Sequence, residues 1–185
     1  CATCHMLDHG GAEPRKTSAG IKGQIGPINS PTVLNSGYNF VQFWDGRAKD
    51  LQEQAAGPVE NPIEMGAKWD NVVERLKKNK EYVAAFGKLY ADGITKDNTT
   101  DAIAEYEKSL ITPSRFDKFL LGDAAAISDA EKKGYATFKE VGCTACHTGI
   151  IVGGTMFQKM GLVKDYFKDR GTAVTDADLG RYNVT

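Results

Sequence analysis

The sequence lacks an excess of charge of either sign, and it lacks long apolar runs. It has 23 Lys and Arg residues against 24 Asp and Glu residues among 185, so its formal net charge is −1. Nucleic-acid binding needs a concentrated basic field, and this balance argues against one. Apolar stretches such as 150–152 fall far short of the roughly 18 residues of a membrane-spanning helix. With 41% hydrophobic residues, the chain can still build one large domain or two small ones.

Cysteine and histidine are also scarce, and most of them stand in one repeated pentapeptide. The sequence has four cysteines and three histidines. It opens with CATCH, from Cys1 through Cys4 to His5, and CTACH returns at residues 143–147. In C-x-x-C-H the two thiols lie about one helical turn apart, where they can form thioethers with the vinyl groups of one haem. The adjacent imidazole can then bind the iron.

Disulfides, a redox pair and a zinc site are the alternatives to haem. A redox C-x-x-C does not need the histidine, and zinc would need further ligands at spacings that are absent here. Because the two motifs use all four cysteines, we predict two covalently bound c-type haems, the second attached to Cys143 and Cys146 and ligated by His147. Covalent haem attachment takes place outside the bacterial cytoplasm, so the motifs also predict a periplasmic protein. His9 would share a helix face with His5 and is expected to be exposed or near a haem propionate.

The rest of the chain predicts a mainly α fold. Residues 10–46 are rich in Gly, Pro, Asn and Ser and predict a long ordered loop with aromatic anchors. Helical patterns follow at 47–56, ended by Gly57 and Pro58, and at 69–78, 81–90, 101–110 and 128–142. The last of these begins with a capping box, Ser128 and Glu131, and leads directly into Cys143.

These patterns predict two cytochrome c-like domains, at residues 1–112 and 113–185, with the change at the stretch 111–123. The first residue already belongs to a motif, and the last residues form no recognisable tail. We therefore expect the start of the first domain and the C-terminal part of the second to be missing.

Several longer stretches resemble one family, the bacterial dihaem cytochrome c peroxidases. They are CATCH, GPINSPTVLN, FWDGRAKDLQEQAAGPVENPIEM, SLITPSRFDKFLLGD and GCTACHTGI, in family order over nearly the whole chain. The resemblance implies that hydrogen peroxide reacts at the N-terminal haem. The C-terminal haem would receive electrons from a small donor protein, a cytochrome or a cupredoxin. It also implies a homodimer and one calcium ion between the domains.

The resemblance assigns roles to four further residues. Glu64, in NPIEM, matches the distal acid-base residue, and Gln54 lies beside it in the pocket. Trp44, in FWDGR, matches the tryptophan between the haems, and Asn29, in INSPT, matches a calcium ligand. The chemistry asks for such a carboxylate in any case, because breaking the O–O bond requires a proton to leave one peroxide oxygen and reach the other. An amide such as that of Gln54 could orient peroxide or stabilise developing charge.

Two departures from the family pattern matter. Many members carry a histidine in the Gly-rich loop that caps the first iron in the oxidised enzyme, whereas SAGIKGQIGP has Ile21 and Lys22 at this place. We therefore predict a first haem without a loop-histidine cap. The axial methionine of the second haem should lie beyond residue 185, and Met156 and Met160 are interpreted as core or gap-filling residues.

The predicted function is that of a peroxidase that reduces hydrogen peroxide to water. One alternative is a dihaem electron carrier without peroxidase activity, against which Glu64 and Gln54 argue. The other is the related class of enzymes that oxidise tryptophans of a partner protein, whose characteristic tyrosine ligand would lie outside this chain.

Overall fold

The fold is built from helices and long loops. The computed structural model describes residues 1–157, 164–165 and 168–169. Within these residues the only β contacts are two isolated bridges, Ala19 with Ile25 and Gln42 with Ala48, so the mainly α class is confirmed. The elements are the helices α1 (Leu51–Glu60), α2 (Trp69–Lys77), α3 (Lys80–Leu89), α4 (Lys96–Lys108), α5 (Arg115–Leu120) and α6 (Asp129–Glu140), and the short 3₁₀ turns η1 (Leu7–His9), η2 (Ile21–Gly23), η3 (Ser36–Tyr38) and η4 (Cys143–Ala145).

The prediction for α1 was wrong at both ends. The helix begins at Leu51, not at residue 47, because Asp50 caps it by accepting a hydrogen bond from the N–H of Glu53 at 2.8 Å. Gly57 and Pro58 lie inside the helix and do not end it. Proline removes one N–H, which costs one helical hydrogen bond. The last turn of α1 is held instead by the turn that follows it.

The other helices agree better with the prediction. α2, α3 and α6 lie within about two residues of their expected bounds, and the capping box of Ser128 and Glu131 is confirmed. α4 begins at Lys96 and not at residue 101, because Thr95 caps it and accepts from the N–H of Asn98 at 3.1 Å. The short helix α5 was not predicted.

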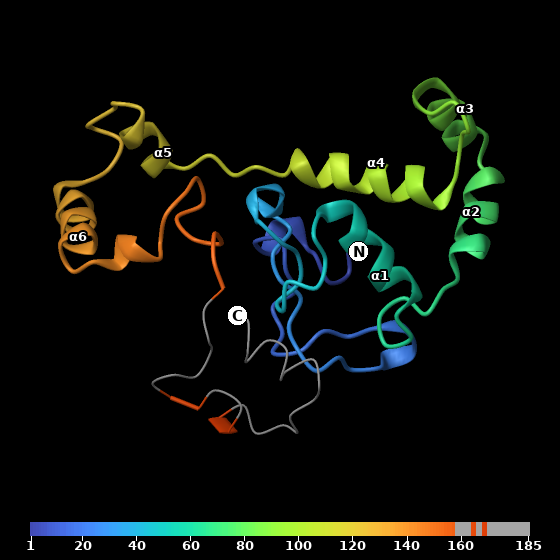
Figure 1. Ribbon diagram of the computed structural model, residues 1–185, viewed down its shortest axis with the longest axis horizontal. Helices are drawn as coiled ribbons and strands as arrows, with labels where there is room; N and C mark the ends of the chain where they lie inside the picture. The colour runs from blue at the N-terminus through green and yellow to red at the C-terminus, as the bar shows by residue number, and fades with distance from the viewer. Residues whose placement is uncertain (158–163, 166–167, 170–185) are drawn as a thin grey trace.

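α1 and α4 pack against each other, and α4 passes above α1 and the long N-terminal loops (Figure 1). Their contact buries Leu51, Ala55 and Ala104, and burial of such side chains is the main stabilising term. Trp69, at the start of α2, is 4% exposed and donates from Nε1 to the carbonyl of Ala56 at 3.1 Å. α3 packs on α2.

The segment between α4 and α5 is held to the N-terminal loop by hydrogen bonds to Asn35. Asn35 donates to Thr112 Oγ1 at 2.6 Å, accepts from the Thr112 N–H at 2.9 Å, and donates its own N–H to the carbonyl of Leu110 at 2.8 Å. Figure 1 shows α5 and α6 at the opposite end of α4 from α2 and α3. None of the helices in the described ranges reaches the length and apolar character of a membrane span. Met160 lies outside the described residues.

Candidate haem sites

The first C-x-x-C-H motif forms a closed turn. The N–H groups of Cys4 and His5 both donate to the carbonyl of Cys1, at 3.0 and 2.8 Å. Cys1 and Cys4 thus lie within one closed turn, and both are free cysteines. No helix runs from His5 to His9, because Met6 between them is extended, with a φ of −80° and a ψ of 111°, and the separate 3₁₀ turn η1 ends at His9. His9 is exposed beside Asp8.

The His5 side chain is suited to bind a metal as a neutral imidazole. Burial lowers the pKa of His5, so the ring is neutral at neutral pH, the form that binds iron. Its Nδ1 is buried without a hydrogen-bond partner, and the carbonyls of Gly11 and Pro31 lie close enough to oppose the lowering of the pKa. Burial also raises the pKa of the Cys4 thiol, as does the carboxylate of Glu13.

Glu64 lies in a tight turn next to this motif. Asn61 Nδ2 donates to Glu64 Oε1 at 2.6 Å, and Asn61 Oδ1 accepts from the N–H of Ile63 at 3.2 Å. The carboxylate is near enough to influence the pKa of both Cys4 and His5. An amide that donates to a carboxylate fixes its orientation. Glu64 is therefore a half-buried, oriented carboxylate beside the first motif.

The end of α1 anchors this turn. The carbonyls of Pro58 and Val59 accept hydrogen bonds from the N–H groups of Met65 and Ala67 at 3.2 and 2.8 Å. Gln54 lies one turn earlier on α1 and is half-buried. Because Pro58 has no N–H, the main-chain carbonyl of Gln54 has no helical donor four residues later. The helix and the turn thus form one unit that carries both Gln54 and Glu64.

The loop with Ile21 folds onto the same turn. It is a hairpin in which Ser18 donates its N–H to the carbonyl of Ile28 at 3.0 Å and accepts from the N–H of Gly26 at 2.8 Å. Its tip donates the N–H of Ile21 to the carbonyl of Glu64 at 2.7 Å. Gln24 Nε2 adds a bond to the carbonyl of Pro62 at 2.8 Å. Gly20 allows this contact, because a Cβ there would lie 1.7 Å from the carbonyl oxygen of Ile63. Ile21 itself is 41% exposed.

The structure joins Trp44 to Asn29. Trp44 Nε1 donates to the main-chain carbonyl of Asn29 at 2.9 Å, and the indole is 43% exposed. The Asn29 amide donates to the carbonyls of Glu13 and Arg15 at 3.1 and 2.6 Å. No group of three or more His, Cys, Asp or Glu side chains suited to a metal ion occurs among the described residues. The calcium site at Asn29 stays a prediction.

The second motif repeats the turn in different surroundings. Cys146 and His147 donate their N–H groups to the carbonyl of Cys143 at 3.2 and 3.0 Å. The His147 ring is exposed, and Nδ1 lies 3.0 Å from the carbonyl of Val152. A carbonyl can only accept, so Nδ1 carries the proton and Nε2 keeps its lone pair for a metal. The Phe138 ring, on α6, packs edge-on against the His147 ring, with the ring centroids 5.7 Å apart.

Large apolar side chains are exposed in the N-terminal loops and in the segments that flank the second motif. An apolar macrocycle such as haem needs side chains of this kind around it. The half-exposed or exposed hydrophobic residues near the first motif in sequence or along its loops are Leu7, Ile21, Ile25, Tyr38, Phe40, Trp44 and Met65, and those flanking the second are Val141, Ile150, Val152, Met156 and Phe157. With two free thiols and an adjacent imidazole in each motif, the residues present fit haem.

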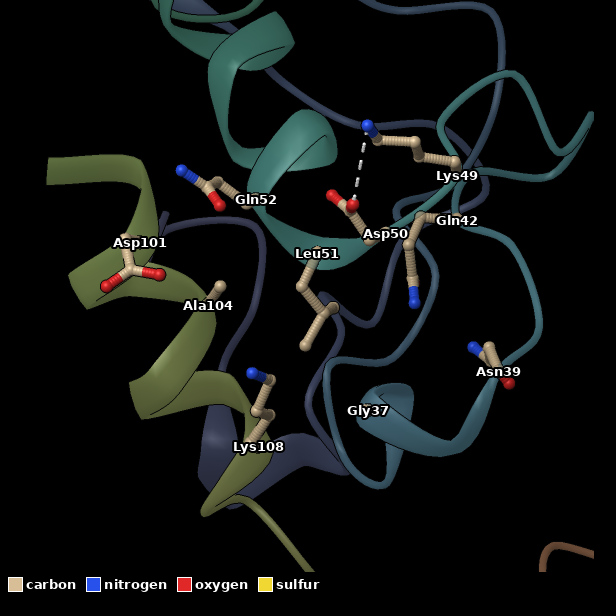
Figure 2. Close-up of a pocket in the computed structure, with 10 residues that line it drawn as sticks. All are labelled: Gly37, Asn39, Gln42, Lys49, Asp50, Leu51, Gln52, Asp101, Ala104 and Lys108. Atoms are coloured by element: carbon tan, nitrogen blue, oxygen red, sulfur yellow. Dashed lines mark ion pairs between the residues drawn. The ribbon is translucent and has the colours of Figure 1, made fainter. Parts of the chain in front are cut away.

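A separate pocket of about 220 Å³ lies between η3, the start of α1, and α4 (Figure 2). Asp50, Lys49, Lys108 and Asp101 give it mixed charge, and Lys49 Nζ lies 4.0 Å from Asp50 Oδ2. None of the residues predicted for the haem sites lines it. We assign it no role.

Sequence reasoning did not identify Asn61, Gly20 or the Val152 carbonyl. The Asn-Pro pair before Glu64 is a turn signal whose asparagine side chain often bonds to nearby backbone, so it could have pointed to Asn61. The other two depend on contacts between segments that the sequence does not pair.

Comparison with known proteins identifies the family and the relatives of the chain. The family model described as di-haem cytochrome c peroxidase matches residues 1–125. Cytochrome c peroxidase Ccp of Escherichia coli K12 is 52% identical over 100% of this chain and 40% of its own length. Cytochrome c551 peroxidase of Nitrosomonas europaea is 49% identical over 100% of this chain and 54% of its own length.

A solved structure agrees in fold. The crystal structure of a MauG-like protein associated with microbial copper homeostasis matches with a TM-score of 0.75 and 24% identity, over 88% of this chain and 53% of that one. The chain thus spans about half the length of the proteins it matches. Because the family model matches most of its residues, this chain belongs to the di-haem cytochrome c peroxidase family.

Proposed function

We propose that the protein of which this chain is part reduces hydrogen peroxide to water, with electrons from a small periplasmic cytochrome or cupredoxin. The observation that carries the proposal is the oriented carboxylate of Glu64 beside the first of two matching C-x-x-C-H turns. Family membership supports haem as the cofactor, and bound haem would supply the redox chemistry.

The first haem would be held covalently by Cys1 and Cys4, with His5 as iron ligand. Cys143 and Cys146 would hold the second haem, with His147 as its ligand. In each turn the shared carbonyl acceptor fixes the positions of the thiols and the imidazole. Residues 1–112 and 113–185 would then each belong to one haem domain.

Glu64 would move the proton that the reaction needs. Its carboxylate takes a proton from one peroxide oxygen and gives it to the other, which leaves as water. Asn61 holds the carboxylate in place, and the backbone bond from Ile21 holds the turn. Gln54, on the helix that carries the turn, would orient peroxide or stabilise developing charge. Two electrons and two protons complete the reduction to two waters.

Trp44 would lie on the electron path between the two sites, and Asn29, bonded to it, would bind one calcium ion at the domain junction. The apolar side chain of Ile21, at the loop tip beside Glu64, supports a first site without a histidine cap. We also propose that the protein is periplasmic and forms a homodimer.

The test uses the full-length protein loaded with haem. Intact mass after denaturation should show two haems bound covalently, and Cys4→Ser and Cys146→Ser should each weaken attachment at one site. Stopped-flow mixing with peroxide and a reduced small cytochrome should then show turnover. Two bound haems with no peroxide turnover would instead identify a dihaem electron carrier and overturn the proposal.

A further inference from the structure

The segment that follows the second motif contacts the loop at residues 39–46 through one aromatic ring. The Phe157 ring packs edge-on against Phe40, with ring centroids 4.9 Å apart and an interplanar angle of 66°. Edge-to-face pairs at this separation are favourable. The neighbouring Gly154 lies close to the Asn39 side chain, since a Cβ on Gly154 would be 3.2 Å from Asn39 Oδ1. Residues 154–157 therefore lie along the loop that leads to Trp44.

The same ring also fills the space over Gly46, two residues after Trp44. A Cβ on Gly46 would lie 2.6 Å from Phe157 Cζ and 2.7 Å from Phe157 Cε1. Carbon atoms that are not bonded do not approach this closely, because optimal contact is about 3.5–4.0 Å. Gly46 also has a φ of 68°, which glycine adopts without strain. The sequence would explain this glycine by its turn alone, whereas the structure gives it a second reason.

We propose that Phe157 is a positioning residue that docks the segment after the second haem motif onto the Trp44 turn. In this proposal Gly46 is glycine because the Phe157 ring occupies the place of its side chain. The docking sets the separation between the Trp44 turn and the turn of Cys143 to His147, and so controls electron transfer between the two sites. This last step rests on the proposed function, whereas the docking itself does not.

Thermal unfolding of the haem-loaded full-length protein tests the docking through four forms: wild type, Gly46→Ala, Phe157→Ala and the double variant. In Gly46→Ala the neighbour that must move is a side-chain ring, so the protein should fold with the ring displaced. Gly93→Ala is the matched control, because Gly93 has a φ of 69° and a Cβ added there would meet no atom within 4 Å. It reports the cost of backbone strain alone, a fall in Tm of about 2–4 °C.

The docking predicts a non-additive cycle. Gly46→Ala should lower Tm more than Gly93→Ala does in the wild-type background, and the excess should shrink in the Phe157→Ala background. Val41 Cγ2, 3.0 Å from the same Cβ position, is present in both backgrounds and cancels. Equal costs of Gly46→Ala in both backgrounds would overturn the docking, because they would leave only strain at the turn.

Electron transfer is the second readout. When the fully reduced protein is mixed with peroxide, Phe157→Ala should slow the oxidation of the second haem by on the order of tenfold, with the absorption spectra of both resting haems unchanged. Phe157→Leu, which keeps an apolar contact, should recover part of the rate. An unchanged rate together with a non-additive cycle would overturn the control of electron transfer but support the docking. If wild type does not react with peroxide, the proposed function fails, and the unfolding cycle still decides the docking.

Discussion

His5 and His147 close the same kind of turn, since each donates its N–H to the carbonyl of the first cysteine of its motif, at 2.8 and 3.0 Å. Their surroundings differ. The His5 side chain is half-buried, with an oriented carboxylate and a docked hairpin nearby, whereas the His147 side chain is exposed, with Phe138 and the Val152 carbonyl as its described contacts.

Each C-x-x-C-H turn forms through local hydrogen bonds, whereas the groups around it come from distant segments. The first motif gains its carboxylate from residue 64 and its loop from residue 21, both brought in by hydrogen bonds across the chain. The proposed function gives peroxide chemistry to the first site and electron relay to the second. Substitutions around the two motifs test that division.

The largest effect should follow from Glu64→Gln. This change keeps the shape of the side chain and its contact with Asn61 but removes the group that accepts a proton. Peroxide turnover should fall by about 10²- to 10⁴-fold, the usual contribution of a general acid-base residue. Steady-state kinetics at saturating electron donor measure it.

Glu74→Gln is the matched control, because Glu74 is an exposed glutamate on α2 and its change should leave turnover intact. Turnover of the Glu64→Gln variant within a few-fold of wild type would remove Glu64 from the reaction.

A smaller loss should follow from Asn61→Asp. The new side chain can still accept from the N–H of Ile63, but it cannot donate to Glu64 and adds a like charge beside it. A hydrogen bond to a charged group contributes about 1.5–3 kcal/mol, so turnover should fall about tenfold to hundredfold. Asn79→Asp is the control, since Asn79 only caps α3 and aspartate caps equally well. Equal behaviour of the two variants would show that Asn61 does not act through Glu64.

Placing a histidine at the loop tip should make the first site resemble a capped one. In Ile21→His, the imidazole would project from the hairpin whose N–H bonds to the Glu64 carbonyl. The oxidised protein should show a low-spin first haem with two histidine ligands, and turnover should fall and recover after reduction. Ile25→His, on the other arm of the same hairpin, should leave the spectrum unchanged. A high-spin spectrum in Ile21→His would place the loop too far from the iron.

Two glutamates, Glu107 on α4 and Glu131 on α6, should make the stability of the protein depend on pH in opposite directions. Burial raises the pKa of Glu107, on α4, to about 7, and its Oε2 has no partner. Between about 4.5 and 7 the folded protein keeps a proton that the unfolded chain has lost, so stability falls as the pH rises through this window. Glu107→Gln should remove that loss and stabilise the protein at pH 8 by about 1–2 kcal/mol, the value being reduced for partial exposure.

Glu131, on α6, has a lowered pKa and therefore the opposite effect on stability. A hydrogen bond from Arg115 lowers the pKa of Glu131 to about 2, so its contribution is present above about 4.5 and is lost as the pH falls toward 2. Thermal unfolding of wild type, Glu107→Gln and Glu131→Gln between pH 2 and pH 8 measures both. A Glu107→Gln variant with the pH dependence of wild type would contradict the buried, uncharged state of Glu107.

The sequence predicted some of the parts of the fold that depend on local signals, although the caps at Asp50, Thr95 and Ser114 were missed. The capping box of Ser128 and Glu131 marks α6 correctly, because both residues lie within one helical turn. The end of α1 was misplaced at Gly57 and Pro58, since the bonds from Met65 and Ala67 that hold its last turn come from a later segment. Propensity alone cannot anticipate such tertiary support.

The candidate sites follow the same rule. The cysteines and histidines could be read directly from C-x-x-C-H, and Glu64 and Trp44 only from a family resemblance. The hairpin contact between Ile21 and Glu64 and the contact of Phe157 with Gly46 join residues far apart in sequence, and no periodicity encodes them. What the sequence leaves out is therefore the arrangement around each haem.

The most direct test of the division between the two sites is an electron paramagnetic resonance spectrum of the oxidised, haem-loaded full-length protein, recorded before and immediately after peroxide is added. We expect a high-spin signal from the haem at His5 that is lost at once on adding peroxide, and that persists in the Glu64→Gln variant. Two low-spin signals that peroxide leaves unchanged until the protein is reduced would contradict an open first site, and signals inert even after reduction would contradict the peroxidase itself.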